Sequence, residues 1–262
     1  TGTVRDSDVV KKVGQGTVDW TTGLITVVGN GPAQEGAVNA SQNHAMAERV
    51  AYIDAMRKLL EIVKGVQVDS TSTVNNFMLT SDVITTTVFG FIQGAKQIGE
   101  TKFLSHGGVQ VTIGMKLTGD LAKALLPEQP AVPPAFPQAA PGGAPVAAGQ
   151  VYTGLIVDAR SIDVRPAMAP KILNEEGKEV YGSAWVNRDW AVHEGMVGYL
   201  KDPAQAQANP RVTNKPLTVK ALRTAGNANV DIVISNADAA AIQNATENLN
   251  MLQKCRVIIL VN

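Results

Sequence analysis

The stretch SQNHAMAERVAYIDAMRKLLEIVK, residues 41–64, decides the fold of the first half of the chain. Its large apolar side chains recur every three or four residues, which places them in one stripe along an α-helix. Asn39 or Ser41 can cap the start of this helix, and Gly65 stands where a C-terminal glycine belongs. We predict a long helix whose stripe packs in the core. The stripe consists of Met46, Val50, Ile53, Met56, Leu60 and Val63.

The segments around this helix are mostly typical of strands, because they are rich in β-branched residues or alternate apolar with polar residues. The turn residues Ser105-His106-Gly107-Gly108 predict a hairpin between the last two of these strands. Residues 83–91 suit either a strand or a short helix, and 118–126 suit a short helix that ends at Pro127. We therefore expect an α+β layer with one main helix on a sheet. The strand segments are 17–28, 66–74, 95–104 and 109–117.

Residues 127–150, PEQPAVPPAFPQAAPGGAPVAAGQ, separate two halves of the chain. They hold seven of the thirteen prolines and a single charged residue, Glu128. This composition forms neither a helix nor a central strand. The sequence therefore predicts a semi-extended Pro/Ala/Gly-rich linker between two domains, residues 1–126 and 151–262.

The half after the linker combines strands and helices in a different order. Asn174-Glu175-Glu176-Gly177 marks a hairpin turn, and the strand–helix–strand order over 230–261 leaves room for a crossover. We therefore predict that the last two strands are parallel, and that the fold class is α+β, with two domains that each pack a small sheet with one main helix. The predicted strands are 152–158, 171–173, 179–181, 216–223, 230–234 and 255–261, with helices at 187–200 and 235–251.

Charge and composition exclude several classes of function. The 262 residues contain 23 Lys plus Arg and 23 Asp plus Glu, and neither half is basic, which argues against a nucleic-acid binder. Charged residues make up 18% of the chain, and a neutral, sparsely charged surface gives little protection against self-association. No run approaches the ~18 apolar residues of a transmembrane helix, so we expect no membrane span.

Residues that could carry chemistry are few and scattered. His44, His106 and His193 have no metal-ligand spacing. The loop that begins Gly29-Asn30-Gly31-Pro32 follows a strand and precedes a helix, but it lacks the glycine pattern of a phosphate-binding loop, so we interpret it as a turn. Cys255 lies in an apolar stretch and is interpreted as a buried core thiol.

We accordingly predict no catalytic, cofactor-binding or metal-binding residues, and no enzymatic activity. One alternative remains, a hydrolase that uses the neighbourhood of Asp158, Arg160 and His193. The densest aromatic cluster consists of Tyr181, Trp185, Trp190 and Tyr199. These four side chains either pack in the core or form a subunit contact, since Trp and Tyr are enriched at interface hot spots.

Several of these segments together resemble the LPP lipoprotein family, which includes outer-membrane lipoproteins and the flagellar assembly proteins of the basal disc and H-ring. The segments are AERVAYIDAMRKLLEIVKGVQVDSTSTV (47–74), SDVI (81–84), GFIQGA (90–95) and the strand GVQVTIGMKL (108–117). The resemblance covers roughly residues 40–120. Residues 153–160 and 166–172 are similar to an extension found on longer secreted or periplasmic relatives. Lipoprotein members carry an acylated cysteine at the mature N-terminus, where this chain has Thr1.

The resemblance implies a ring, disc or filament subunit outside the inner membrane, with association to the outer membrane. The start at Thr1 indicates either a removed signal peptide or another processed end, and with the resemblance we expect a secreted, periplasmic or cell-surface protein. Strand edges that can pair and a long linker also favour a homo-oligomer. We therefore expect a non-enzymatic, self-assembling structural protein of the bacterial envelope. The alternative is a monomeric periplasmic module that binds a ligand or peptide.

Overall fold

The computed structural model describes residues 8–33, 39–105, 107–126, 150–243 and 246–262. These residues form two compact units. Unit 1 comprises Val10–Val66 and Val74–Leu117, and unit 2 comprises Gln67–Thr73 and Thr118–Asn262, together with residues 8–9. The predicted linker, apart from Gln150, and His106 lie outside the described residues. Helices and two sheets are present, so the predicted α+β class with two domains is confirmed.

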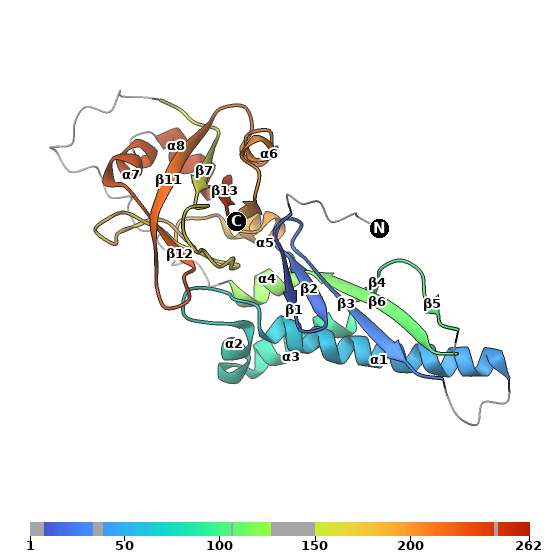
Figure 1. Ribbon diagram of the computed structural model, residues 1–262. Coiled ribbons are helices and arrows are strands. Elements are labelled where there is room, and N and C mark those ends of the chain that lie inside the picture. Colours follow the sequence, from blue (N-terminus) through green and yellow to red (C-terminus); the bar gives the residue numbers. More distant parts are fainter. Residues whose placement is uncertain (1–7, 34–38, 106, 127–149, 244–245) are drawn as a thin grey trace. The chain divides into compact units, whose positions relative to one another are not determined.

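Unit 1 is an antiparallel sheet with helices on one face (Figure 1). Its strand order is β1-β2-β3-β6-β4, and β5 also pairs with β6. Alternate side chains of β3 and β6 are buried against α1, and the side chains between them form a Thr/Asn/Gln-rich outer face. The elements are β1 (Val10–Val13), β2 (Gly16–Asp19), β3 (Leu24–Gly31), α1 (Ala40–Lys64), α2 (Val74–Thr80), α3 (Asp82–Gln93), β4 (Lys96–Gln97), β5 (Lys102–Phe103) and β6 (Val109–Lys116).

Helix α1 has the predicted ends but buries a different face. The Asn39 side chain accepts the N–H of Gln42 at 2.9 Å, and Gly65 closes the helix. Of the predicted stripe only Val63 is buried, whereas Met56 and Leu60 are half-buried and the N-terminal members are exposed. The prediction that the whole stripe lies in the core was therefore wrong. The buried residues of α1 are Ala47, Ala51, Ala55, Leu59, Ile62 and Val63.

Two glycines of β3 explain why small residues face the sheet. A Cβ at Gly31 would lie 1.8 Å from the carbonyl oxygen of Ala47, and one at Gly29 would lie 2.0 Å from that of Ala51. The backbones of β3 and α1 are in direct contact at this crossing, so α1 can place only alanines on the face that meets β3. Gly29-Asn30-Gly31 is thus the end of a strand rather than the predicted turn.

Asp54 fastens α1 to β3 beside this crossing. Its carboxylate accepts the N–H of Asn30 at 3.0 Å and pairs with the Lys58 ammonium at 2.6 Å and with Arg57 at 3.0 Å. Partial burial alone would raise the pKa of Asp54, but the hydrogen bonds from Lys58, Asn30 and Arg57 outweigh it and hold the pKa below its usual value. The carboxylate therefore stays charged while it joins helix and strand.

Three further segments of the first half differ in part from the predicted structure. Residues 66–74 form a turn instead of a strand, because the Asp69 carboxylate accepts the N–H groups of Thr71 and Ser72, each at 2.8 Å. Residues 83–91 lie in helix α3, whose start is capped by the Ser81 hydroxyl. The hairpin is antiparallel as predicted, but its first strand breaks into β4 and β5 around Gly99, where φ is 74°.

Unit 2 contains a seven-stranded mixed sheet in the order β10-β13-β7-β11-β12-β8-β9. The hairpin of β8 and β9 around Gly177 and the strands near 152–158 and 216–223 form as predicted. The elements are α4 (Asp120–Leu125), β7 (Gly154–Asp158), β8 (Ile172–Leu173), β9 (Glu179–Tyr181), α5 (Arg188–Glu194), β10 (Gly198–Leu200), α6 (Pro203–Gln207), β11 (Pro216–Ala225), β12 (Asp231–Ile234), α7 (Asn236–Gln243), α8 (Thr246–Gln253) and β13 (Val257–Leu260).

The predicted parallel pairing of the last two strands was wrong. Strands β7 and β11 lie between β12 and β13. Because β13, β7 and β11 are parallel and β12 is antiparallel to β11, the last two strands run in opposite directions. All four residues of β13 are buried, so this strand stabilises the sheet from its interior, between β10 and β7, rather than beside β12.

Two segments from before the linker pack within unit 2. The Arg188 guanidinium donates to the carbonyl oxygens of Lys123 at 2.7 Å and Leu126 at 3.3 Å, and so caps the C-terminal end of α4. The N–H of Ala169 donates to the carbonyl oxygen of Val68 at 2.7 Å. Residues 118–126, which we expected in the first domain, therefore group with unit 2. No helix among the described residues has the length and apolar character needed to cross a membrane.

Candidate functional site

Exposed large apolar side chains gather on unit 1. Among the described residues, unit 2 exposes only Val151, Trp190 and Leu222, from three separate elements or loops. Isolated apolar side chains of that kind are normal on a protein surface, whereas several on one small unit indicate an interaction surface. Those of unit 1 are Val28, Met46, Val50, Ile53, Leu79, Val83, Phe89 and Phe103.

A shallow groove of about 530 Å³ runs beside the N-terminal half of α1. Its rim is held in place by two hydrogen bonds. The Tyr52 hydroxyl donates to the carbonyl oxygen of Ala95 at 2.8 Å, and the Thr101 hydroxyl donates to the Glu48 carboxylate at 2.7 Å. We name this feature the α1 groove, and it is lined by Ala45, Glu48, Arg49, Tyr52, Ile53, Met56 and Gln97.

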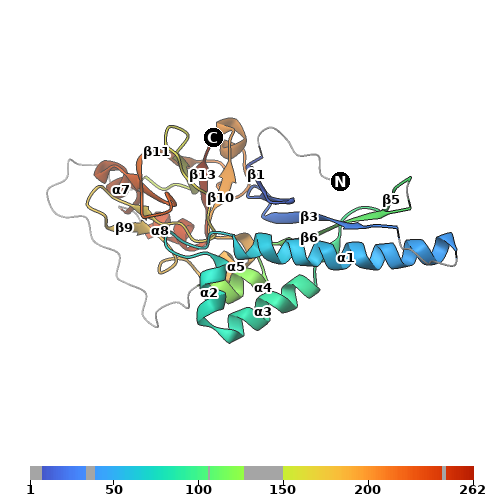
Figure 2. The same ribbon diagram turned by 60° about the horizontal axis from the view of Figure 1, so that its bottom comes forward.

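The α1 groove is open because α3 ends partway along α1. Figure 2 shows α3 beside the C-terminal half of α1, while no helix of unit 1 accompanies the N-terminal half. Beyond Gly94 the chain turns into β4. Along the apolar stripe, Val63 is therefore buried whereas Val50 is 37% and Ile53 is 56% exposed. Exposure along the stripe thus falls from the N-terminal members to half-buried Met56 and Leu60 and to buried Val63.

The second apolar surface is formed by α2 and α3, residues 74–93, which we name the α2–α3 arm. Asp82 is its single charged residue. Leu79 is 78% exposed, Val83 is 76% and Phe89 is 44%. A helical surface with a single charge and such side chains in water favours contact with another apolar surface.

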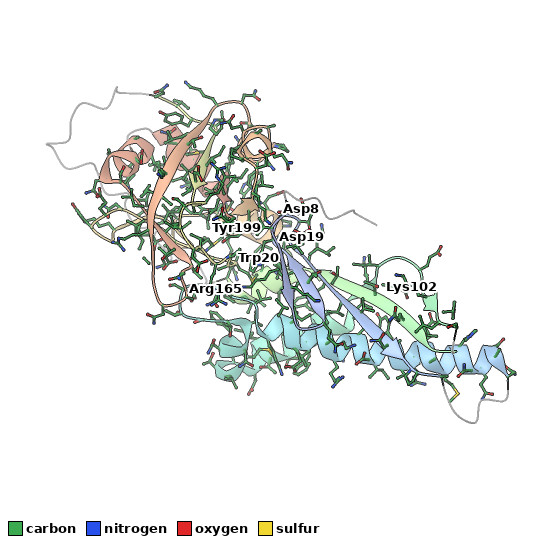
Figure 3. All side chains as sticks on the ribbon, viewed as in Figure 1. Asp8, Asp19, Trp20, Lys102, Arg165 and Tyr199 are labelled. Carbon is green, nitrogen blue, oxygen red and sulfur yellow. The ribbon has the colours of Figure 1, made fainter. Side chains whose placement is uncertain are left out.

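The strand edges of unit 1 are poorly suited to pairing with another chain. The edge strand β1 is four residues long and carries Lys11 and Lys12. At the other edge, β4 begins with Lys96 and β5 begins with Lys102, which Figure 3 labels. Short edges that carry lysines are a common protection against edge-to-edge pairing. The apolar helical surfaces are therefore the better candidates for an interface.

The four aromatic residues proposed as a subunit contact are mostly interior to unit 2. Tyr181 and Tyr199 are buried, and Figure 3 shows Tyr199 among the side chains of this unit. The Tyr181 hydroxyl donates to the carbonyl oxygen of Met196 at 2.5 Å, and that of Tyr199 donates to Ala167 at 3.0 Å. Burial raises the pKa of both phenols.

Trp185 is also buried, and only Trp190 of the four is largely exposed, at 44%. A contact through this cluster would therefore rest on Trp190 alone.

The residues of the hydrolase alternative do not come together. Arg160 pairs with both oxygens of Asp158, at 2.9 and 2.7 Å, and this hydrogen-bonded pair lowers the pKa of Asp158. Asp158 is level with Leu200 across β13 at the carboxyl end of these parallel strands. His193 precedes the start of β10 and thus belongs to the opposite end of the sheet.

His44 and the possible metal-binding groups can also be placed in the part of the chain that the structure describes. The imidazole of His44 stacks at a tilt on Phe103, with ring centroids 4.7 Å apart, and is distant in sequence from His193. Within the described ranges, no three His, Cys, Asp or Glu side chains are grouped so that they could hold a metal ion.

Cys255 is fully buried, and burial raises the pKa of its thiol to about 11. The reactive thiolate is therefore scarce at neutral pH, and it is also shielded from reagents. We predict that the native protein reacts very slowly with Ellman's reagent at about pH 8, near the pKa of a free thiol. The chain unfolded in guanidinium chloride should react fully within minutes. Rapid reaction of the native protein would show that unit 2 opens readily at this strand.

Comparison with known proteins gives a family match for most of unit 2. The fold is that of a two-domain α+β protein, and residues 154–262 match the family described as Treponema pallidum Tp0624, second domain. The match spans β7 to β13 and less than half of the chain, and unit 1 lies outside it. No curated protein matches the chain.

Proposed function

We propose that this protein is a non-enzymatic, self-assembling structural protein of the bacterial cell envelope or exterior, a subunit of a ring, disc or filament. The observation that carries the proposal is the pair of apolar surfaces on unit 1, the α1 groove and the α2–α3 arm. The resemblance of residues 40–120 to the LPP lipoprotein family supports a location at the envelope, including the flagellar base. Secretion and association with the outer membrane form part of the same proposal.

The free energy needed for a stable complex favours these two surfaces over isolated apolar side chains as the interface. Burial of one large apolar side chain contributes about 1.5–3 kcal/mol. A micromolar complex needs about 8 kcal/mol after the cost of association is met. Several side chains must therefore be buried together. Unit 1 exposes enough of them on two neighbouring helical surfaces, whereas the scattered side chains of unit 2 do not suffice.

Self-association is tested by sedimentation velocity and mass photometry of the whole chain at micromolar concentration. Because the proposed contact is apolar and the formal net charge is zero, assemblies should persist in about 1 M salt, where the Debye length is about 3 Å. Dissolution by salt would mean that ion pairs hold the assembly. A 27.6 kDa monomer at every concentration and salt would remove the proposal.

The second candidate is a monomeric periplasmic module that binds a ligand or peptide, and the α1 groove favours it. Its lining combines apolar side chains with Glu48, Arg49 and Gln97, which could orient a bound peptide. A monomeric protein whose intrinsic Tyr52 or Trp fluorescence responds to an amphipathic helical peptide, and whose Ile53→Asp variant does not, would support this candidate.

A further inference from the structure

We infer that residues 150–262 carry a docking surface for the half of the chain that precedes them, and that the two halves bind each other even when segment 127–149 is cut. The occupants of the surface are the loop Gln67–Thr73 and helix α4, which belong to unit 2 although they come earlier in the chain. Leu126 and Gln150, on either side of segment 127–149, also belong to unit 2. The segment therefore joins two parts of unit 2, and the binding is independent of self-assembly.

The first occupant, the loop, is hydrogen-bonded to residues 167–169. The N–H of Met168 donates to the carbonyl oxygen of Gln67 at 3.1 Å, and the N–H of Ala169 donates to that of Val68 at 2.7 Å. The Val68 side chain has no exposed surface. Separation of the two halves would break both backbone hydrogen bonds and expose an apolar side chain, so the contact favours the bound state.

The loop is held in one shape by its own hydrogen bonds. The Gln67 side-chain amide donates to the carbonyl oxygens of Asp69 at 2.6 Å and Ser72 at 3.2 Å. The docking surface is also fitted to the loop, because a Cβ at Gly226 would lie 2.8 Å from the Cβ of Ser70. Glycine at this position leaves the space that the loop occupies. A preformed loop on a fitted surface loses little conformational entropy when it binds.

The second occupant, α4, packs against α5 and is bound to it at both ends. The guanidinium of Arg188, the first residue of α5, donates to two carbonyl oxygens at the C-terminal end of α4. Just before α4, the N–H of Gly119 donates to the carbonyl oxygen of Val192 at 2.7 Å. Hydrogen bonds from a charged donor are stronger than neutral ones, and apolar burial adds to them. The buried side chains of α4 are Leu121, Ala122 and Leu125.

The half that carries the docking surface contains a complete sheet. All seven strands of unit 2, β7 to β13, lie within residues 150–262, whereas the loop and α4 come from the other half. In the intact chain, segment 127–149 keeps the halves at an effective concentration of about 1 mM. A dissociation constant of about 1 μM or lower, which the two occupied contacts favour, would hold the halves together without it.

A protease recognition site inserted in segment 127–149 tests this binding on the whole chain. The folded protein is cleaved to completion and passed through a size-exclusion column at about 10 μM, above a micromolar dissociation constant. The two fragments should elute together and in equal amounts. Fragments that elute separately would overturn the inference, while self-association of the uncleaved chain would be unaffected.

Two variants assign the binding to the named surface. Arg188→Ala removes the cap of α4, and Val68→Asp places a carboxylate at the buried position of the loop. In the cleaved protein each should raise the dissociation constant between the halves about tenfold or more. Arg223→Ala is the matched control, because Arg223 is exposed on β11, and it should leave this constant unchanged.

Circular dichroism of each uncleaved variant checks that its fold is retained. If Val68→Asp unfolds the uncleaved chain, the comparison of Arg188→Ala with Arg223→Ala decides. Halves that stay together equally well in the wild type, in Arg188→Ala and in Arg223→Ala would place the contact elsewhere and overturn the inference.

Discussion

Leu59→Asp is expected to unfold unit 1. Leu59 has no exposed surface and lies on the face of α1 that packs against the sheet. An unpaired carboxylate in such a place costs several kcal/mol, whereas the whole stability of a domain is about 5–15 kcal/mol. Thermal unfolding followed by circular dichroism, with amide hydrogen exchange on β3 and β6, should show the loss of this unit.

Leu60→Asp is the matched control for that experiment. The adjacent residue carries the same side chain, but it is only half-buried, so its substitution should cost clearly less. The sequence pattern alone assigned Leu60 to the core. Equal losses for the two variants, or a larger loss at Leu60, would show that α1 is rotated from the position described.

Gly31→Val should be nearly as damaging, although valine suits a strand. The added Cβ would lie 1.8 Å from the carbonyl oxygen of Ala47, so β3 and α1 would have to move apart. We expect a loss of about 3 kcal/mol or more, because the shift also opens the alanine-lined contact on either side. The free energy of unfolding in urea measures it directly.

Gly90→Ala serves as the control for Gly31→Val, because at position 90 an added side chain has room. Gly90 lies inside α3, and nothing stands within 4 Å of a Cβ at this position. Alanine should therefore stabilise the helix by up to about 1 kcal/mol. If Gly31→Val were tolerated as well as Gly90→Ala, the close crossing of α1 over β3 would be disproved.

Much of the local structure could be predicted from the sequence, because it depends on neighbours in the chain. The ends of α1 follow from the Asn39 side chain and from Gly65, and the hairpin at Gly177 follows from a glycine with φ of 78°. The α+β class follows from the alternation of strand-like and helical patterns. The open candidate surface is also visible in part, since two residues that line the α1 groove, Ile53 and Met56, belong to the apolar stripe that the sequence pattern predicts.

What the sequence by itself determined is therefore the α+β class and the ends of several elements, since caps, turns and side-chain periodicity act over a few residues. It did not determine every element, since residues 66–74 form a turn and the predicted helix 187–200 ends at Glu194 before strand β10. Only the tertiary structure decided which face of α1 is buried, because two glycines on a distant strand let alanines approach more closely than any large side chain. Tertiary packing also decided that residues 118–126 join unit 2, through Arg188, and that β13 lies inside the sheet. Contacts between residues far apart in the chain set these features, and no local pattern encodes them.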